Sequence, residues 1–199
     1  MRPAHRHPGN QSRSTKSRRG GSLRAIVLAV LAVCLVADAQ TGKPTEYQVK
    51  AAYLFNFARF VKWPAGDISS NDTFSICVLG NDPFGAVLDS TVAGEHIEGK
   101  RVVARRVNNA GDAQRCRIVF VSGSEERRLG PILSTLDRSP VLTVSDISGF
   151  ADHLGMIQFV MENDRVRFEV NLTAAQKAGL SLSSELLKVA TTVKGQAGE

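Results

Sequence analysis

Apolar and polar positions along the chain follow two different periods, and each period predicts a different kind of element. From Tyr47 to Pro64 the apolar side chains recur at helical spacing, so this segment is predicted to be an amphipathic helix. It should end at Pro64, because the residue before a proline is driven out of the helical region. Six of the twelve aromatic residues of the chain lie in this segment. A helix this aromatic must bury much of its surface or offer it to a partner.

The rest of the chain alternates short apolar strands with helices. Strands are predicted at Thr73–Gly80, Lys100–Val107, Arg117–Val121 and Val141–Val144. One helix is predicted to begin with Asp82 as its N-cap and Pro83 as its first helical residue. Three further helices are predicted at Glu125–Leu136, Thr173–Ala178 and Ser183–Val193, the last capped by Ser183. Ile147–Leu154 is predicted to be a short helix or a turn.

A hairpin is predicted near the C-terminus, where Met156–Glu162 and Arg165–Val170 flank Asn163-Asp164. In the second of these strands apolar and charged residues alternate strictly, as in a sheet with one wetter face. The predicted fold class is therefore α/β: a single-domain sandwich whose mixed sheet is parallel at its start, ends in an antiparallel hairpin and is flanked by helices.

The N-terminal 39 residues have the layout of a secretory signal peptide. Residues 1–24 carry seven Lys/Arg and no acid, an apolar run of about twelve residues follows, and Ala37-Asp38-Ala39 places small residues where a signal peptidase reads. We expect cleavage near Ala39, export and a mature α/β domain at 40–199. The alternative is a retained anchor, for which the apolar run is short of the roughly 20 residues that span a bilayer.

Removing residues 1–39 changes the meaning of the charge. The whole chain has 25 Lys/Arg and 19 Asp/Glu, and losing seven basic residues and Asp38 leaves 18 of each. The basic character thus belongs to the export segment. A nucleic-acid partner is not expected, because it would need a basic surface on the mature domain.

Cys77 and Cys116 are the two cysteines left after residue 39. An exported protein with an even number of cysteines usually pairs them, and this bridge would close a loop of about 40 residues. Two buried free thiols are the alternative, since each cysteine lies in or beside an apolar strand. A catalytic redox pair is disfavoured, because the two do not form a C-x-x-C motif.

Motifs for catalysis are missing from the sequence. It has no H-E-x-x-H, G-x-S-x-G or G-x-x-x-x-G-K-[ST] motif, and His96 and His153 have no metal-ligand spacing to another histidine or cysteine. No catalytic residue, metal ligand or cofactor is therefore predicted. The sequence therefore favours a binding protein over an enzyme.

Four segments resemble the YfiR-like family in order along nearly the whole mature chain. They are KAAYLFNFARFVKWP, FSICVLGNDPFG, PVLTVSDISGFADHLGMIQF and RVRFEVNLTAAQKAGLSLSSELLKVA. The resemblance implies an exported α/β protein of Gram-negative bacteria that represses an inner-membrane diguanylate cyclase by binding its periplasmic sensory domain, with release under envelope or redox stress. It also implies a homodimer.

The resemblance identifies Cys77 and Cys116 with the family's disulfide pair, which supports fold stability. A second disulfide of some members would fall near residues 151–158, where this chain has no cysteine. A redox switch that depends on that second pair is therefore not expected here.

Exposed apolar residues of the aromatic helix or the C-terminal helix are the predicted contact with the cyclase. The candidate contact residues are Arg59, Phe60, Lys62, Trp63 and Arg167. The alternative for the aromatic stripe is ordinary core, where apolar helix faces are usually buried. The competing function is a periplasmic module that binds an unknown small ligand and reports to another membrane receptor, such as a histidine kinase.

Overall fold

The structure is a computed structural model that describes residues 43–64 and 73–195. The predicted signal segment, residues 1–39, lies outside these ranges. None of the helices in the described ranges has the length and apolarity that crossing a bilayer requires.

A mixed sheet forms the centre of the domain. Within the described residues it has eight strands in the order β10-β8-β7-β6-β5-β2-β4-β3. Their bounds are β2 Thr73–Leu79, β3 His96–Ile97, β4 Lys100–Val107, β5 Ile118–Val121, β6 Leu142–Ser145, β7 Ile157–Glu162, β8 Arg165–Asn171 and β10 Thr192–Lys194. Strands β4, β2, β5, β6 and β7 run parallel, and β7 and β8 form an antiparallel hairpin. The predicted fold class is confirmed.

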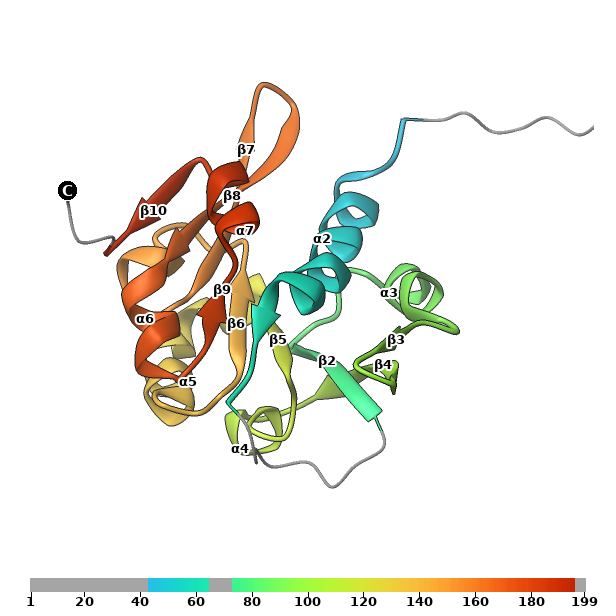
Figure 1. The fold of residues 1–199 in the computed structure, drawn as a ribbon, viewed down its shortest axis with the longest axis horizontal. Helices are drawn as coiled ribbons and strands as arrows, with labels where there is room; N and C mark the ends of the chain where they lie inside the picture. Colours follow the sequence, from blue (N-terminus) through green and yellow to red (C-terminus); the bar gives the residue numbers. More distant parts are fainter. Residues whose placement is uncertain (1–42, 65–72, 196–199) are drawn as a thin grey trace, which may run out of the picture. The chain divides into compact units, whose positions relative to one another are not determined.

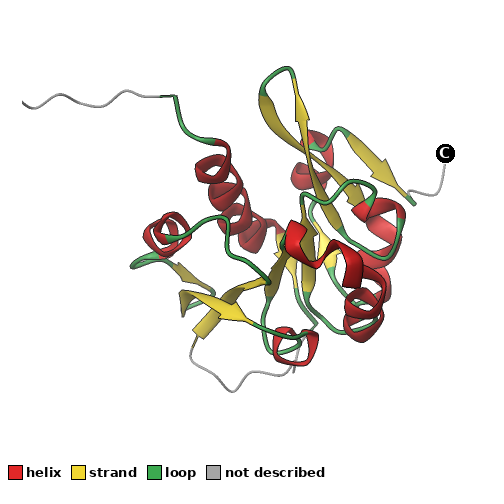
Figure 2. Ribbon diagram, turned by 180° about the vertical axis from the view of Figure 1, so that it is seen from behind, coloured by secondary structure: helices red, strands yellow, loops and turns green. Residues whose placement is uncertain are grey.

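Helices cover both faces of this sheet (Figure 1 and Figure 2). One face packs against α2 Glu46–Phe60, α3 Ala86–Val92, α6 Leu172–Lys177 and α7 Ser184–Val189, and the other packs against α4 Ala110–Ala113, the 3₁₀ helix η1 Gly123–Arg128 and α5 Leu129–Leu136. A further 3₁₀ turn, η2, spans Phe150–Asp152. Strand β2 lies inside the sheet between β5 and β4, and both of its faces are apolar: Ile76 and Val78 point toward α2, and Cys77 and Leu79 point toward α5.

Two predicted helices end earlier in the structure than the sequence indicated. Helix α2 ends at Phe60, and the next two residues form β1 Val61–Lys62, which pairs antiparallel with β9 Ser181–Leu182. The last helix, α7, ends at Val189 instead of Val193, because Thr192–Lys194 pairs with β8 as strand β10. Pairing with a distant strand overrides the local helical pattern at both ends.

The prediction that Asp82 caps a helix beginning at Pro83 is wrong. Helix α3 begins at Ala86, after Gly85 with a φ of 52°. The Asp82 carboxylate accepts from the Phe84 N–H at 2.8 Å and so closes a local turn ahead of the helix. The predicted cap at Ser183 is confirmed, because its hydroxyl accepts from the Leu186 N–H at 3.3 Å.

Candidate functional site

The N-terminal half of α2 is anchored at the carboxyl edge of the sheet. Thr45 and Gln48 form a capping box, in which each side chain accepts from the other residue's backbone N–H. One turn later Lys50 is only 3% exposed, and its Nζ lies 2.6 Å from Oδ2 of Asp146, which follows β6. Glu46 pairs with the same ammonium, and the Tyr47 hydroxyl donates to Asp146 at 3.2 Å. This half of the helix is held by a nearly buried ion pair.

The pKa values of this cluster follow from burial and from charge. Burial opposes the charged form of Lys50, but its hydrogen bonds to Asp146 and Glu46 outweigh this effect and raise the Lys50 pKa. Burial and the neighbouring negative charge of Asp146 raise the Tyr47 pKa. Lys50 therefore stays charged, and Tyr47 neutral, through the neutral range. The cluster therefore positions α2 through a charged lysine and its carboxylate partners.

The C-terminal half of α2 packs its rings against the hairpin. Tyr53 and Phe57 contact Phe159 of β7 and Phe168 of β8, with ring centroids between 5.1 and 5.9 Å apart. Phe57 is 1% exposed and belongs to the main core. Much of the aromatic stripe is therefore core, as the alternative reading of the sequence held.

An apolar groove remains open between α2 and α7, with Phe168 of β8 contributing to its lining. We call it the α2/α7 groove, and its volume is about 400 Å³. It is lined by Tyr53, Asn56, Phe57, Phe60, Phe168, Glu185, Leu186 and Val189. Phe60 is 39% exposed and Val189 is 55% exposed, so a large apolar side chain from each helix faces solvent. Figure 1 shows both helices on the same side of the sheet.

Backbone contacts place α7 beside α2. The Ser183 N–H donates to the Phe60 carbonyl at 2.9 Å, directly after the β1–β9 pair joins the two segments. Beyond α7, the Thr191 N–H donates to the Phe168 carbonyl at 2.9 Å. The groove is thus built by segments that are about 120 residues apart in the sequence and fixed at both ends of α7.

The five predicted contact residues do not share one surface. Phe60 lines the α2/α7 groove, and Lys62 is exposed in β1. Arg59 instead lies 3.8 Å from Glu95 and stacks on the Phe55 ring. Trp63 packs edge-on against Phe74, and its Nε1–H is a buried donor that finds no acceptor in the described part of the chain.

Arg167 alternates with Phe168 along β8 and points away from the groove. The sequence predicted neither Asn56 nor Glu185, Leu186 and Val189 as individual site residues. Leu186 and Val189 are three residues apart and so lie on one side of α7, but only the position of α2 makes that side part of a groove.

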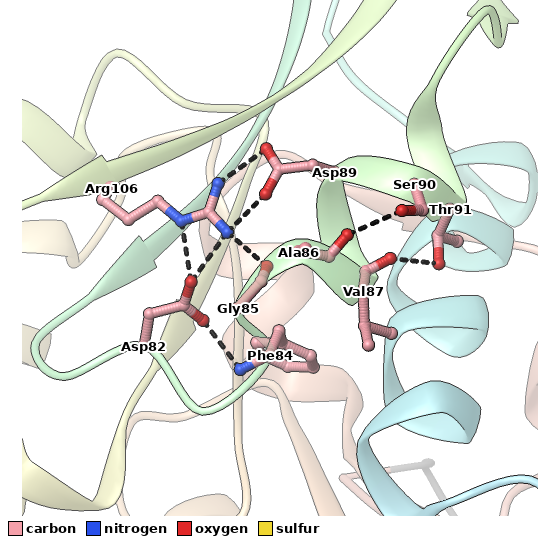
Figure 3. Close-up of polar contacts among 9 residues, drawn as sticks. All are labelled: Asp82, Phe84, Gly85, Ala86, Val87, Asp89, Ser90, Thr91 and Arg106. Atoms are coloured by element: carbon pink, nitrogen blue, oxygen red, sulfur yellow. Dashed lines mark hydrogen bonds and ion pairs between the residues drawn. The ribbon is translucent and has the colours of Figure 1, made fainter.

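Arg106 of β4 organises the loop that leads into α3 (Figure 3). Its Nε donates to Asp82 at 2.8 Å, and Nη1 and Nη2 reach Asp89 and the Gly85 carbonyl, each at 2.7 Å. The hydrogen bond from Arg106 lowers the Asp89 pKa. All these contacts are internal, so Arg106 has a structural role.

A disulfide joins Cys77 of β2 to Cys116, in the turn between α4 and β5. The two Cα atoms are 6.1 Å apart, within the usual range for a disulfide. Both residues are buried in the core beneath α5. Of the two possibilities that the sequence left open, the structure has the bridge and not two free thiols.

No group of three or more His, Cys, Asp or Glu is arranged to hold a metal ion among residues 43–64 and 73–195. The groove is lined mainly by rings and aliphatic side chains, with Asn56 and Glu185 as its polar members. Such a surface can bind another apolar surface, but it offers no nucleophile paired with a base.

Two solved structures are similar to parts of this chain. A conserved domain protein from Vibrio cholerae O1 biovar eltor matches with a TM-score of 0.51 and 12% identity, over 77% of this chain and 62% of that chain. The ABC domain in complex with L-Trp from Streptococcus pneumonia matches with a TM-score of 0.49 and 11% identity, over 72% of this chain and 60% of that chain. This chain thus spans about three fifths of each, and the first likeness shows the fold alone.

A family model gives the stronger result. The model described as YfiR/HmsC-like matches residues 47–191, which is more than half of the chain. The matched range begins in α2, contains both bridged cysteines and ends just after α7, so it includes every residue of the groove. The resemblance seen in the four sequence segments is confirmed, and the chain belongs to the YfiR/HmsC-like family.

Proposed function

We propose that this protein is exported to the periplasm, binds the sensory domain of an inner-membrane diguanylate cyclase and represses it. Membership of the YfiR/HmsC-like family supports a periplasmic regulator of cyclic di-GMP signalling. The finer statement, that a cyclase is the partner and that binding represses it, is our proposal. It acts by binding rather than by catalysis.

The observation that carries the proposal is the α2/α7 groove. Phe60 and Val189 expose apolar surface on either side of a cavity whose lining also includes the rings of Tyr53, Phe57 and Phe168. Interfaces gain most of their free energy from a few bulky side chains in such desolvated pockets. We propose that an apolar side chain of the cyclase sensory domain fills the groove, and that exposed Lys62, two residues after Phe60, adds a basic contact.

Repression follows if the partner segment presents this apolar surface only in the inactive cyclase. A binding protein shifts a two-state equilibrium only by the difference between its affinities for the two states. Moving a cyclase from mostly active to mostly inactive, 99:1 to 1:99, would need about 10⁴-fold preference for the inactive state.

Val189→Glu tests the groove directly. A carboxylate at this exposed position should leave the fold intact, but should place a charge against the partner's apolar side chain and weaken binding about tenfold or more. We expect cellular cyclic di-GMP to rise toward the level of a deletion strain. The matched control is Leu154→Glu, an apolar residue of similar exposure that lines a separate cavity beside α5.

Three outcomes separate the possibilities. Derepression by Val189→Glu but not by Leu154→Glu, at equal melting temperatures, supports the groove. Equal behaviour of the two variants argues against it. Crosslinking in cells that recovers a histidine kinase and no cyclase, with unchanged cyclic di-GMP on deletion, would replace the proposal with the ligand-sensor alternative.

A further inference from the structure

A second, basic cleft lies on the opposite face of the sheet, beside the disulfide. Its volume is about 240 Å³, and Arg105 of β4, Asn108, Asp112 of α4, Arg115 and Cys116 contribute to its lining. Arg105 is the register partner of Cys77 in the parallel β2–β4 ladder. The cleft therefore brings two arginines from separate elements to one point of the fold. We call it the Arg105–Arg115 cleft.

Both of these arginines are exposed, and within the described ranges neither forms an ion pair. Arg106, the next residue of β4, also lines the cleft, but its guanidinium is paired with Asp82 and Asp89 and so is not free for a ligand. The acid that lines the cleft is Asp112, which accepts from Asn109 Nδ2 at 2.7 Å. Two unpaired guanidinium groups against one carboxylate leave the cleft with a net positive charge.

The backbone that carries Arg115 is held by hydrogen bonds and by the disulfide. The Arg115 and Cys116 N–H groups donate to Asp112 and Ala113 at 3.2 and 3.0 Å, and the next N–H, of residue 117, donates to Ser75 of β2 at 2.9 Å. The disulfide fixes the same turn to Cys77. Anion binding here should cost little conformational entropy, because the fold has already ordered the backbone of the cleft.

We propose that the Arg105–Arg115 cleft binds a phosphate-type oxyanion, either as free phosphate or as the phosphate of an anionic phospholipid. The planar guanidinium fork matches phosphate oxygens, and two forks from different elements can contact one tetrahedral anion. The volume is below the roughly 300 Å³ at which pockets for drug-sized ligands begin, so it suits a single small group.

The first test is titration of the purified protein with inorganic phosphate, followed by NMR shifts of the Arg115 and Cys116 amides. We expect saturable shifts, and Arg105→Gln or Arg115→Gln should each weaken binding about tenfold, the loss of one charge-assisted contact. Asp112→Asn should strengthen binding, because it removes the one carboxylate of the cleft. The control is Arg127→Gln, which removes an exposed charge in η1 outside the cleft.

The second test uses sedimentation with vesicles of phosphatidylglycerol or phosphatidylcholine. Binding to phosphatidylglycerol that Arg105→Gln abolishes identifies the lipid headgroup as the source of the oxyanion. Saturable phosphate binding without vesicle binding identifies the free ion. The proposal is overturned if neither probe binds, if Arg127→Gln weakens binding as much as the cleft variants, or if only a polyglutamate peptide binds.

Discussion

At the scale of single residues, neighbouring arginines of one strand have opposite surroundings. Arg106 is surrounded by two carboxylates and a carbonyl, whereas Arg105, on the other face of β4, lies in a cleft with Arg115. The strand's period of two explains why adjacent residues face different elements. The sequence shows two adjacent arginines here, and only the structure separates a structural one from a candidate ligand-binding one.

Arg106→Gln should flatten the acid limb of the stability curve. Arg106 lowers the folded-state pKa of Asp89, so the Arg106–Asp89 pair stabilises the folded protein. This stabilisation is complete above the unfolded-state pKa of about 3.8 and is lost as the pH falls through the folded-state pKa. Asp89 is exposed, and we therefore expect an effect of only about 1 kcal/mol at pH 7. Urea unfolding at pH 7 and pH 3 checks this: the variant should lose less stability on acidification than wild type. If Arg106→Gln loses as much unfolding free energy between pH 7 and pH 3 as wild type and Arg127→Gln do, the Arg106–Asp89 contact does not stabilise the protein.

At the scale of elements, long strands with regular patterns could be predicted and short ones could not. Strand β4 has the predicted bounds Lys100–Val107, and the β7–β8 hairpin turns at Asn163-Asp164 as expected. The pairs β1–β9 and β10–β8 involve strands of two or three residues, whose sequences carry too few positions to show a period. They exist because distant segments supply their hydrogen bonds.

The Cys77–Cys116 bridge ties two elements together, and its loss should be costly. With 39 residues of sequence separation, the chain-entropy model gives about 4 kcal/mol for the double variant Cys77→Ala/Cys116→Ala. Urea unfolding measures the change. Reduced wild type serves as the matched comparison and should fall to a similar stability, while reductant should leave the double variant unaffected. Equal stabilities of oxidised wild type and the double variant would contradict a stabilising bridge.

At the scale of the whole molecule, the aromatic helix α2 divides between core and surface. Its N-terminal half is locked by the Lys50–Asp146 pair, and Phe57 is enclosed by the hairpin. Phe60, three residues later, borders the groove. The hydrophobic pattern alone treats Phe57 and Phe60 as one stripe. Their different surroundings come from the β7–β8 hairpin, whose rings enclose Phe57, whereas Phe60 stays 39% exposed at the groove.

Phe57→Ala and Phe60→Ala should therefore differ in their effect on stability, because one removes a buried ring and the other an exposed ring. Removing the buried ring should lower the free energy of unfolding by about 3–5 kcal/mol, because it leaves a cavity among other rings. Removing the exposed ring should change it by about 1 kcal/mol or less. Urea titrations of both variants at one pH give the comparison. Equal losses would mean that Phe60 is as much a part of the core as Phe57.

The sequence by itself determined the fold class, the aromatic helix, the β7–β8 hairpin and the family, because these depend on periodicity and on segments that are continuous in the chain. Tertiary structure decided which residues share a surface, and it separated the predicted contact residues from one another. It placed Phe60 with Val189, turned Arg59 toward Glu95 and paired Arg105 with Arg115 across one cleft. Such juxtapositions depend on the crossing of elements far apart in sequence, and local propensity carries no information about that crossing.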